Sequence, residues 1–372
     1  MPDAAHPPGP ARGPGPPGRR DLLALPKAHL HLHFTGSMRP GTLTQLAEQH
    51  DLRLPELLRE HHLLRVPADE RGWFRFQRLY EAARACVRGE ADMRRLVHEA
   101  AADDAAEGSR RLELQIDPTS YAPLVGGLTP ALEIVLDAAR EASTATGCQV
   151  AVVVAASRLR HPLDARTLAR LAARHVGDGA GQVVGFGLSN DERRGDTSAF
   201  GPAFALARRA GLASVPHGGE LLGAGHVDHV LDTLRPDRLG HGVRSVEDPR
   251  TLARVVAAGV GLEVCPASNV GLGIYPTASE VPLQTLLDAG AAVALGADDP
   301  LLFGSRLTAQ YEIARDVGGL DDDTLAELAR HSLRLSRAPA DDVSRWLGEV
   351  DRWLAVPAPP TGRDAGDDPL RA

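Results

Sequence analysis

Three histidines that alternate with apolar residues are the first residues in this sequence whose types and spacing could do chemistry. His29, His31 and His33 stand two positions apart and are separated by leucines. In an extended strand, residues two apart point to the same face, so we expect a row of three imidazoles. Neutral imidazole is a good ligand for zinc and similar ions. The row therefore predicts a metal site, and a His-rich, half-exposed edge strand is the alternative.

Further ionisable residues follow apolar segments much later in the chain. They are His217, Glu220, His241, Asp298 and Asp299. Two or three histidines with one carboxylate leave a coordination position open on a zinc ion, and water bound there gives hydroxide near neutral pH. All of these residues except His217 also have a purely structural explanation. The two aspartates or Glu220 could cap a helix, and His241 could be an ordinary turn residue.

Apolar segments alternate regularly with helical patterns, and this alternation must position the ionisable residues. Strands are expected after residue 26 and at 112–117, 149–156, 183–188, 212–216, 238–240, 260–265 and 292–296. Helices are expected between them, at 91–108, 130–146, 163–175, 199–211, 226–234, 248–258 and 281–289. Strands that alternate with helices in this way predict a parallel sheet covered by helices.

Eight strand–helix units over about 270 residues predict an α/β fold of the (β/α)8 TIM barrel type. The active site of such a barrel lies at the carboxyl ends of the strands, which is where the ionisable residues stand. A doubly wound sheet is the alternative, but it would place a Gly-rich phosphate-binding turn after its first strand. His31 and His33 occupy that place, and no such motif follows them. The sequence therefore favours the barrel.

The barrel is expected to carry additions at both ends. A broken helical stretch from about 42 to 89 forms an insertion after the first strand, and helices at 321–335 and 340–354 complete the domain. The domain is predicted to span 21–355, with a disordered Pro/Gly-rich tail at 1–20 and a loose tail at 356–372. Four aromatic residues at helical spacing in the insertion indicate core packing, or alternatively the wall of a pocket for a planar ligand. They are Trp73, Phe74, Phe76 and Tyr80.

Composition excludes several classes of protein. The 372 residues carry a formal net charge of −8, which argues against binding of a nucleic-acid backbone. No apolar segment is long enough to span a membrane, and the first residues lack the apolar core of a secretory signal. Three widely spaced cysteines indicate reduced, buried thiols, so a cytoplasmic protein without membrane or nucleic-acid partners is expected.

Five short motifs resemble the signatures of the adenosine deaminase family of metal-dependent amidohydrolases. In chain order they are P-K-A-H-L-H-L-H-F-T-G-S, H-G-G-E, L-G-H-G, E-V-C-P and L-G-A-D-D-P, between about residues 26 and 303. Together they are specific, although no single motif would be. The resemblance implies a (β/α)8 barrel, one catalytic Zn²⁺ per subunit and a purine nucleoside as the substrate.

The resemblance also implies a role for individual residues. Carried over by motif, the metal ligands are His31, His33, His217 and Asp298. His29 matches a position that is not a ligand in the family, so it is left out. Glu220 would protonate purine N1 as hydroxide adds to C6, and His241 would orient or deprotonate the metal-bound water. The residues expected to contact the substrate are His33, Thr35, Asn190 and Asp299, the last through N7 and the attacking oxygen.

Two departures from the family pattern concern the sugar side of the substrate. Thr35 stands where adenosine-specific members typically have Asp, and Asn190 stands where they have Gly. The backbone N–H of that Gly serves purine N3, and Asn190 can still donate one. The turn at 191–194 is expected to be solvated, with an arginine contact to a substrate carboxylate as the alternative.

The expected reaction is zinc-dependent deamination of adenosine and 2′-deoxyadenosine to inosine, 2′-deoxyinosine and ammonia. The alternative substrates are adenine and a 5′-modified adenosine such as aminodeoxyfutalosine. A catalytically silent nucleoside-binding protein is less expected, because Glu220, His241 and all four ligands are present. A zinc site of the cytidine deaminase type is excluded, because no second cysteine lies near Cys265.

Overall fold

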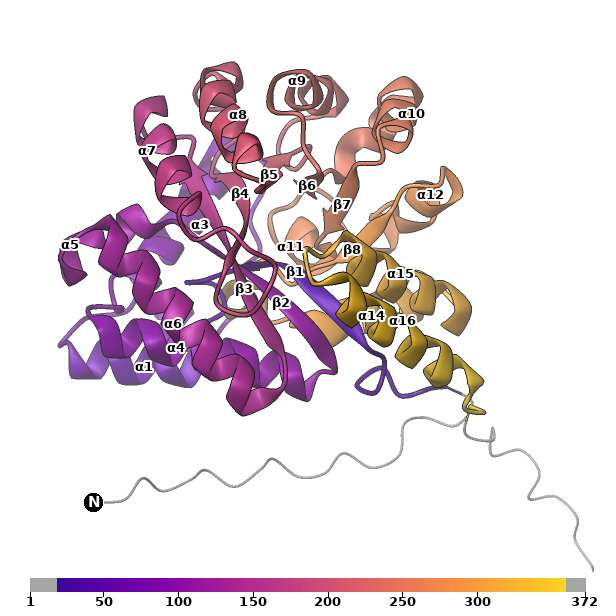
Figure 1. Cartoon of the computed structure of the whole chain (residues 1–372), viewed down its shortest axis with the longest axis horizontal. Helices are drawn as coiled ribbons and strands as arrows, with labels where there is room; N and C mark the ends of the chain where they lie inside the picture. Colours follow the sequence, from indigo (N-terminus) through magenta and orange to yellow (C-terminus); the bar gives the residue numbers. More distant parts are fainter. Residues whose placement is uncertain (1–18, 359–372) are drawn as a thin grey trace, which may run out of the picture.

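A nearly closed ring of eight parallel strands forms the centre of the computed structural model, which describes residues 19–358 (Figure 1). The strands are β1 (Lys27–His33), β2 (Ser109–Ile116), β3 (Gln149–Ser157), β4 (Val183–Ser189), β5 (Ala213–Gly218), β6 (Arg238–His241), β7 (Gly261–Val264) and β8 (Val293–Leu295). Neighbours pair in sequence order, and an isolated parallel bridge between Leu32 and Asp298 joins β1 to the segment that follows β8. The (β/α)8 barrel predicted from the sequence is confirmed.

Helices surround the ring, and Figure 1 shows α7 to α10 fanning outward around β4 to β7. In the barrel repeats they are α4 (Glu90–Ala106), α6 (Leu128–Thr146), α7 (Pro162–Ala172), α8 (Gly201–Arg209), α9 (Ala224–Leu234), α10 (Pro249–Ala257) and α12 (Leu283–Asp288). The insertion after β1 holds α1 (Pro40–Gln49), α2 (Glu56–Arg59) and α3 (Glu70–Arg84), and α15 (Asp322–Leu335) and α16 (Ala340–Ala355) follow the barrel. Four further helices were not predicted: α5 (Ala122–Val125), α11 (Pro266–Gly271), α13 (Pro300–Phe303) and α14 (Leu307–Asp316).

Two different kinds of interior fill the barrel. Near β3, β4 and β5 the packing is apolar, and it consists of Ala151, Val153, Val184, Ala213 and Val215. Near β2, β6 and β7 the interior holds fully buried charged side chains, namely Arg111, Glu113, Arg238 and Glu263. The main hydrophobic core lies between the outer face of the strands and the helices. Strands buried on both faces explain the nearly continuous apolar runs in the sequence.

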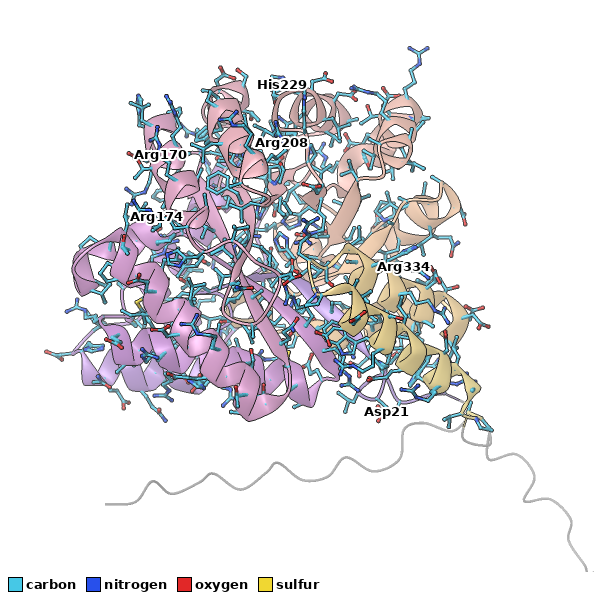
Figure 2. All side chains as sticks on the ribbon, viewed as in Figure 1. Asp21, Arg170, Arg174, Arg208, His229 and Arg334 are labelled. Carbon is cyan, nitrogen blue, oxygen red and sulfur yellow. The ribbon has the colours of Figure 1, made fainter. Side chains whose placement is uncertain are left out.

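The ends of the described chain lie close together. Arg20 donates from Nε to the carbonyl of Val356 at 3.0 Å and pairs with Asp322 at 2.6 Å. The tails predicted at 1–20 and 356–372 lie outside the described residues, except for 19–20 and 356–358. Among the described residues, no helix is long and apolar enough to cross a membrane. Charged side chains such as Arg170, Arg174 and Arg334 project from the outside of the helix ring (Figure 2).

Candidate active site

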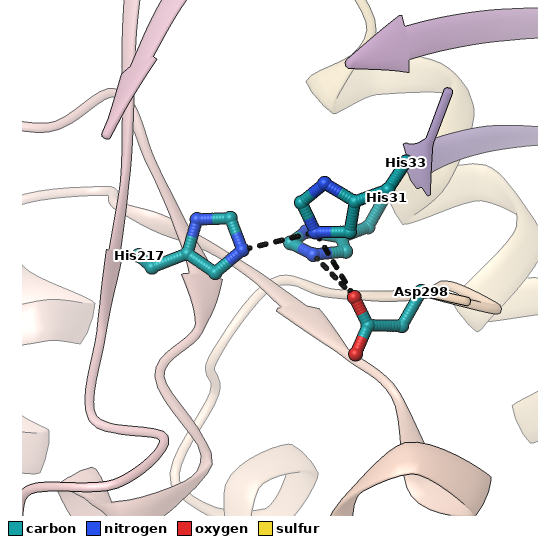
Figure 3. A group of neighbouring side chains, drawn as sticks. All are labelled: His31, His33, His217 and Asp298. Atoms are coloured by element: carbon teal, nitrogen blue, oxygen red, sulfur yellow. Dashed lines mark hydrogen bonds and ion pairs between the residues drawn. The ribbon is translucent and has the colours of Figure 1, made fainter. Parts of the chain in front are cut away.

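Four of the predicted site residues converge at the carboxyl ends of the strands. His31 and His33 come from β1, His217 comes from β5, and Asp298 follows β8 (Figure 3). Their candidate ligand atoms all lie within 4.8 Å of one another. His33 Nε2 lies 3.3 Å from His217 Nε2 and 3.1 Å from Asp298 Oδ1, and His31 Nε2 lies 3.4 Å from the same oxygen.

These residues fit a zinc ion. Atoms that share one zinc ion at bonds of about 2.0–2.1 Å lie about 2.9–3.6 Å apart for bond angles between 90° and 120°, and the three distances fall in this range. His31 Nε2 is buried and has no hydrogen-bond partner within residues 19–358. Burial and the neighbouring histidines hold the pKa of His217 well below its usual range, so this imidazole is neutral and able to donate a lone pair. Three nitrogens and one carboxylate oxygen are a donor set that suits zinc.

His29 does not join this group. Its Nδ1 lies 3.0 Å from Asp104 Oδ1 on α4, and its Nε2 accepts a hydrogen bond from Ala297 N. An irregularity in the pairing with β2 separates His29 from Leu32. The expectation of three imidazoles in one row is therefore wrong for His29, whose buried polar atoms are satisfied by protein groups.

Buried charged side chains contact the Nδ1 side of the His31 imidazole and hold the ring in place. His31 Nδ1 lies 2.7 Å from Glu263 Oε2 on β7, and Arg238 Nε donates to the other oxygen of Glu263 at 2.6 Å. Arg238 also donates to Glu113 at 2.6 Å. A carboxylate that accepts from Nδ1 fixes the tautomer in which Nε2 carries the free lone pair. The charged residues inside the barrel therefore orient the first candidate ligand.

The backbone at the site adopts unusual conformations. Asn190, His241 and Asp298 have φ angles of 80°, 69° and 60°, in the left-handed region that most residues avoid. Such residues cluster at functional sites, where the surrounding structure holds them. Gly240 is required beside them, because a Cβ there would lie 2.9 Å from Cε1 of His31. The backbone of β6 thus leaves room for the imidazoles.

Glu220 and His241 face each other beside the metal group. His241 Nε2 lies 3.4 Å from Glu220 Oε1, and both side chains are almost completely buried. Burial, reinforced by the charges of Asp298 and Glu192, raises the pKa of Glu220 well above its usual range. Burial lowers the pKa of His241 to about 3. At neutral pH the carboxyl can therefore donate a proton, and the neutral imidazole can accept one.

The loop that carries Glu220 is held by a second carboxylate. Glu192 accepts hydrogen bonds from the backbone N–H groups of residues 220, 221 and 222, at 3.1, 2.9 and 2.7 Å. Asp191 and Glu192 are only 4% and 2% exposed. The expectation of a solvated turn at 191–194 is therefore wrong for its first two residues. Of the two arginines of that turn, Arg194 is exposed, whereas Arg193 is partly buried and pairs with Asp191 at 2.8 Å.

Asp299 packs directly against the backbone of the loop after β1. A Cβ on Gly36 would lie 1.8 Å from Asp299 Oδ1 and 2.7 Å from its Cα, so no larger residue fits there. Asp299 Oδ1 is buried without a partner among the described residues. Burial, with the charge of Asp298, raises the pKa of Asp299 well above its usual range. A protonated Asp299 could donate a hydrogen bond to a ring nitrogen.

Aromatic side chains of α3 contribute to an open pocket beside the metal group. Trp73, Phe76 and Tyr80 line it together with Glu220, His241, Asp298 and Asp299. Both interpretations of the aromatic cluster hold for these three residues, because Phe76 belongs to the hydrophobic core, Trp73 and Tyr80 pack against it, and all three line the pocket. Phe74 is 68% exposed and belongs to neither the core nor the wall.

Of the two residues that depart from the family pattern, Asn190 lines this pocket and Thr35 lines the neighbouring one. Thr35 is buried, and its Oγ1 lies 2.5 Å from the hydroxyl of Tyr121. Asn190 lines the cavity, and its left-handed backbone is the conformation that glycine adopts most readily. The backbone N–H of Asn190 has no hydrogen-bond partner within the described chain, so it remains available to a ligand.

Sequence reasoning assigned no role to Glu263, Arg238 or Glu192. For Glu263 the sequence does contain a signal, because this charged residue lies between Leu262 and Val264 in the apolar strand β7. A buried charge needs partners, so a lone Glu in such a strand points to an internal network. Glu192 gave no comparable signal, since acidic residues are common in exposed turns.

Comparisons with known proteins agree with this arrangement. The family model described as adenosine deaminase matches residues 26–353. A Streptomyces virginiae protein with the provisional name adenosine/adenine deaminase is 59% identical over 90% of this chain and 98% of its own. An adenine deaminase of Ralstonia nicotianae is 31% identical over 90% of this chain and 96% of its own. The crystal structure of an adenine deaminase from Arthrobacter aurescens superposes with a TM-score of 0.81 at 30% identity, covering 89% of this chain and 99% of that one.

Proposed function

The chain belongs to the adenosine deaminase family, and on that premise we propose that it removes the 6-amino group of an adenine ring by hydrolysis with one bound zinc ion. The resemblance inferred from the sequence motifs is confirmed, and the chain is a hydrolytic deaminase that acts on a C–N bond. The observation that carries the proposal is the convergence of His31, His33, His217 and Asp298 beside Glu220 and His241.

We propose that His31, His33, His217 and Asp298 hold the zinc ion. When bound there, zinc would lower the pKa of water towards 7 and so supply hydroxide at neutral pH. Glu220 is not counted among the ligands, although it forms a second possible group with His241 and Asp298. Its raised pKa favours the protonated carboxyl, which is a poor metal ligand.

The remaining polar residues would move or hold protons at named atoms. Glu220 donates its proton to purine N1, which makes C6 more electrophilic. His241 accepts the proton of the attacking water, because its imidazole is neutral. Asp299 donates a hydrogen bond to N7 and thereby fixes the ring in the plane that exposes C6. The amino group then takes the proton held by His241 and leaves as ammonia, the proton of the new C6 hydroxyl returns to Glu220, and a 6-oxopurine protonated at N1 remains. Trp73, Phe76 and Tyr80 limit the access of bulk water.

Adenosine and 2′-deoxyadenosine are the substrates that we propose first. The catalytic pocket adjoins a second polar pocket at the carboxyl ends of β2 and β3. There is therefore room for a substituent on the purine ring, such as a sugar. Adenine is the second candidate, because relatives at 31–32% identity are named adenine deaminases. Thr35 also favours adenine, since it offers no carboxylate to a ribose hydroxyl.

The test is release of ammonia from a panel of 6-aminopurines by the zinc-loaded protein. The panel contains adenine, adenosine, 2′-deoxyadenosine, 5′-deoxyadenosine and AMP, and the ratio of kcat/KM values ranks them. We expect turnover of at least one member, accompanied by its 6-oxo product. No ammonia from any member would reject the proposed reaction.

A further inference from the structure

The loop at the end of β5 carries two of the proposed site residues. His217 stands at the carboxyl end of the strand, and Glu220 follows it by three residues. Pairing between β4 and β5 ends at Leu188 and Pro216, whereas pairing between β5 and β6 continues to residue 218. On the side of β4, contacts other than strand pairing must therefore hold this loop.

Arg158 supplies such a contact. It directly follows β3, and its Nη2 donates a hydrogen bond to the backbone carbonyl of His217 at 2.5 Å. Its Nη1 donates to Oγ1 of Thr197 at 2.7 Å, and its backbone N–H donates to the carbonyl of Ser189 at the end of β4 at 3.1 Å. Arg158 therefore joins the ends of three consecutive strands of the ring, β3, β4 and β5.

The guanidinium of Arg158 is a buried charge. The residue is 3% exposed, and its side chain bonds a carbonyl and a hydroxyl within the described part of the chain. Burial lowers the pKa of Arg158, and the negative charges of Glu192, Glu220 and Asp191 act against this effect. A hydrogen bond from a charged donor is stronger than one between neutral groups, so the carbonyl of His217 is held firmly.

Glu192 holds the same loop with the opposite charge. Its carboxylate accepts hydrogen bonds from the backbone N–H groups of residues 220 to 222, whereas Arg158 donates to the carbonyl of residue 217. Burial raises the pKa of Glu192, and the positive charge of Arg158 acts against this rise. The donors of the loop thus face a carboxylate, and its first carbonyl faces a guanidinium.

Arg158 makes these contacts from outside the substrate space. Its neighbours Ser157, Leu159 and Arg160 line the second pocket, but Arg158 lines neither that pocket nor the catalytic one. Its guanidinium is bonded to β5 and to Thr197 instead. Any effect of Arg158 on the reaction must therefore pass through the β5 loop.

We propose that Arg158 is a positioning residue, whose hydrogen bond to the carbonyl of His217 sets the places of the His217 imidazole and the Glu220 carboxyl. This role presupposes the proposed function, in which His217 binds zinc and Glu220 protonates the ring. Without the guanidinium, the start of the loop shifts and carries both side chains with it. A displacement of about 1 Å is enough to cost about 100-fold in rate.

Zinc affinity tests the effect on His217 without any turnover. In competition with a chromogenic chelator, Arg158→Met should bind zinc about tenfold more weakly than the wild type, as is typical when the support of a ligand is lost. Arg158→Lys keeps the charge but not the planar fork, so it should lie between the two. This milder variant carries the test if Arg158→Met does not fold. Wild-type zinc affinity in every folded Arg158 variant would overturn the proposal.

Arg208→Met is the matched control. Arg208 Nη1 donates to the carbonyl of Leu234 at 2.5 Å, at the end of α9 that lies away from the β5 loop. The contact is of the same kind as that of Arg158, but it holds no site residue. Arg208→Met should therefore leave the zinc affinity and kcat unchanged, even where it lowers the unfolding temperature.

Steady-state kinetics of the zinc-loaded proteins test the effect on Glu220. We expect Arg158→Met to lower kcat about 100-fold and to leave KM within about threefold, because Arg158 does not touch the substrate. A loss confined to KM, or a kcat equal to that of Arg208→Met, would overturn the proposal. No ammonia from any purine with the wild type would reject only the proposed reaction, since zinc affinity would still test the contact with His217.

Discussion

Glu263 Oε2 lies 2.7 Å from Nδ1 of His31, and both side chains are completely buried. The carboxylate of Glu263 also accepts a hydrogen bond from Arg238, and Arg238 donates a second one to Glu113. His31 is therefore the end of a buried network of paired charges. A carboxylate behind a ligating histidine orients the ring and raises its basicity.

Glu263→Gln should therefore weaken zinc binding. The amide can still accept from Nδ1 but carries no charge, so we expect zinc affinity to fall about 10- to 100-fold. Competition with a chromogenic chelator measures this change. Glu247→Gln is the control, because Glu247 forms an exposed ion pair with Arg244 and should leave affinity unaltered. Equal affinities for wild type and Glu263→Gln would show that the carboxylate does not support a ligand.

Gly36→Ala should impair turnover through Asp299. The added methyl group would collide with the carboxyl and the Cα of Asp299, which must then shift. We expect kcat/KM to fall about 100-fold, as is typical when a catalytic group is displaced by about 1 Å. Gly41→Ala is the control, since nothing lies within 4 Å of a Cβ at that position of α1. Full activity of Gly36→Ala would show that Asp299 takes no part in the reaction.

Glu220→Gln should lower kcat with little effect on zinc content. The amide keeps the shape of the side chain but cannot transfer a proton, so we expect a loss of about 10² to 10⁴ in kcat. Steady-state assays with metal analysis of the same sample make the comparison. A variant that keeps most of its activity would show that another group protonates the ring.

The pH dependence of kcat/KM should report the raised pKa of Glu220. The protonated carboxyl is the active form, so activity is full below that pKa and is lost as pH rises through it. Burial is the largest cause of the raised pKa of Glu220, and the negative charge of Glu192 raises this pKa further. Glu192→Gln should therefore move the alkaline limb to lower pH. Profiles of the two proteins on one substrate test the shift. If the alkaline limb does not move, a group other than Glu220 causes it.

His29→Leu should cost stability and leave the metal site intact. Asp104 would lose its partner and Ala297 N its acceptor, so we expect a loss of about 2 kcal/mol in the free energy of unfolding. Zinc stoichiometry should stay at one per chain, whereas His33→Leu should abolish tight binding. Metal analysis after dialysis, with urea unfolding, distinguishes the two variants. Loss of zinc from His29→Leu would place His29 among the ligands.

Much of the barrel could be predicted because its strands are apolar on both faces and alternate with helices. The convergence of His31, His217 and Asp298 followed from one rule, that parallel strands of a barrel end at the same rim. The short helices α11 and α13 could not be predicted, because they have only 6 and 4 residues, too few to show a helical period.

The supporting contacts were beyond the sequence for a physical reason. Glu263 and Glu192 act through neighbours that are distant along the chain, and periodicity describes only local structure. His29 illustrates the reverse case, because its spacing matched that of the ligands while its partners lie on α4 and after β8. Spacing placed a histidine on the strand, but the tertiary contacts decided its role.

The central claim is that one zinc ion held by His31, His33, His217 and Asp298 supports deamination of a purine. The most direct measurement is ammonia release from adenosine and adenine by metal-free protein during titration with zinc. The account predicts that release appears with zinc and saturates at one ion per chain. No ammonia from either substrate at saturating zinc, or full release without zinc, would contradict it.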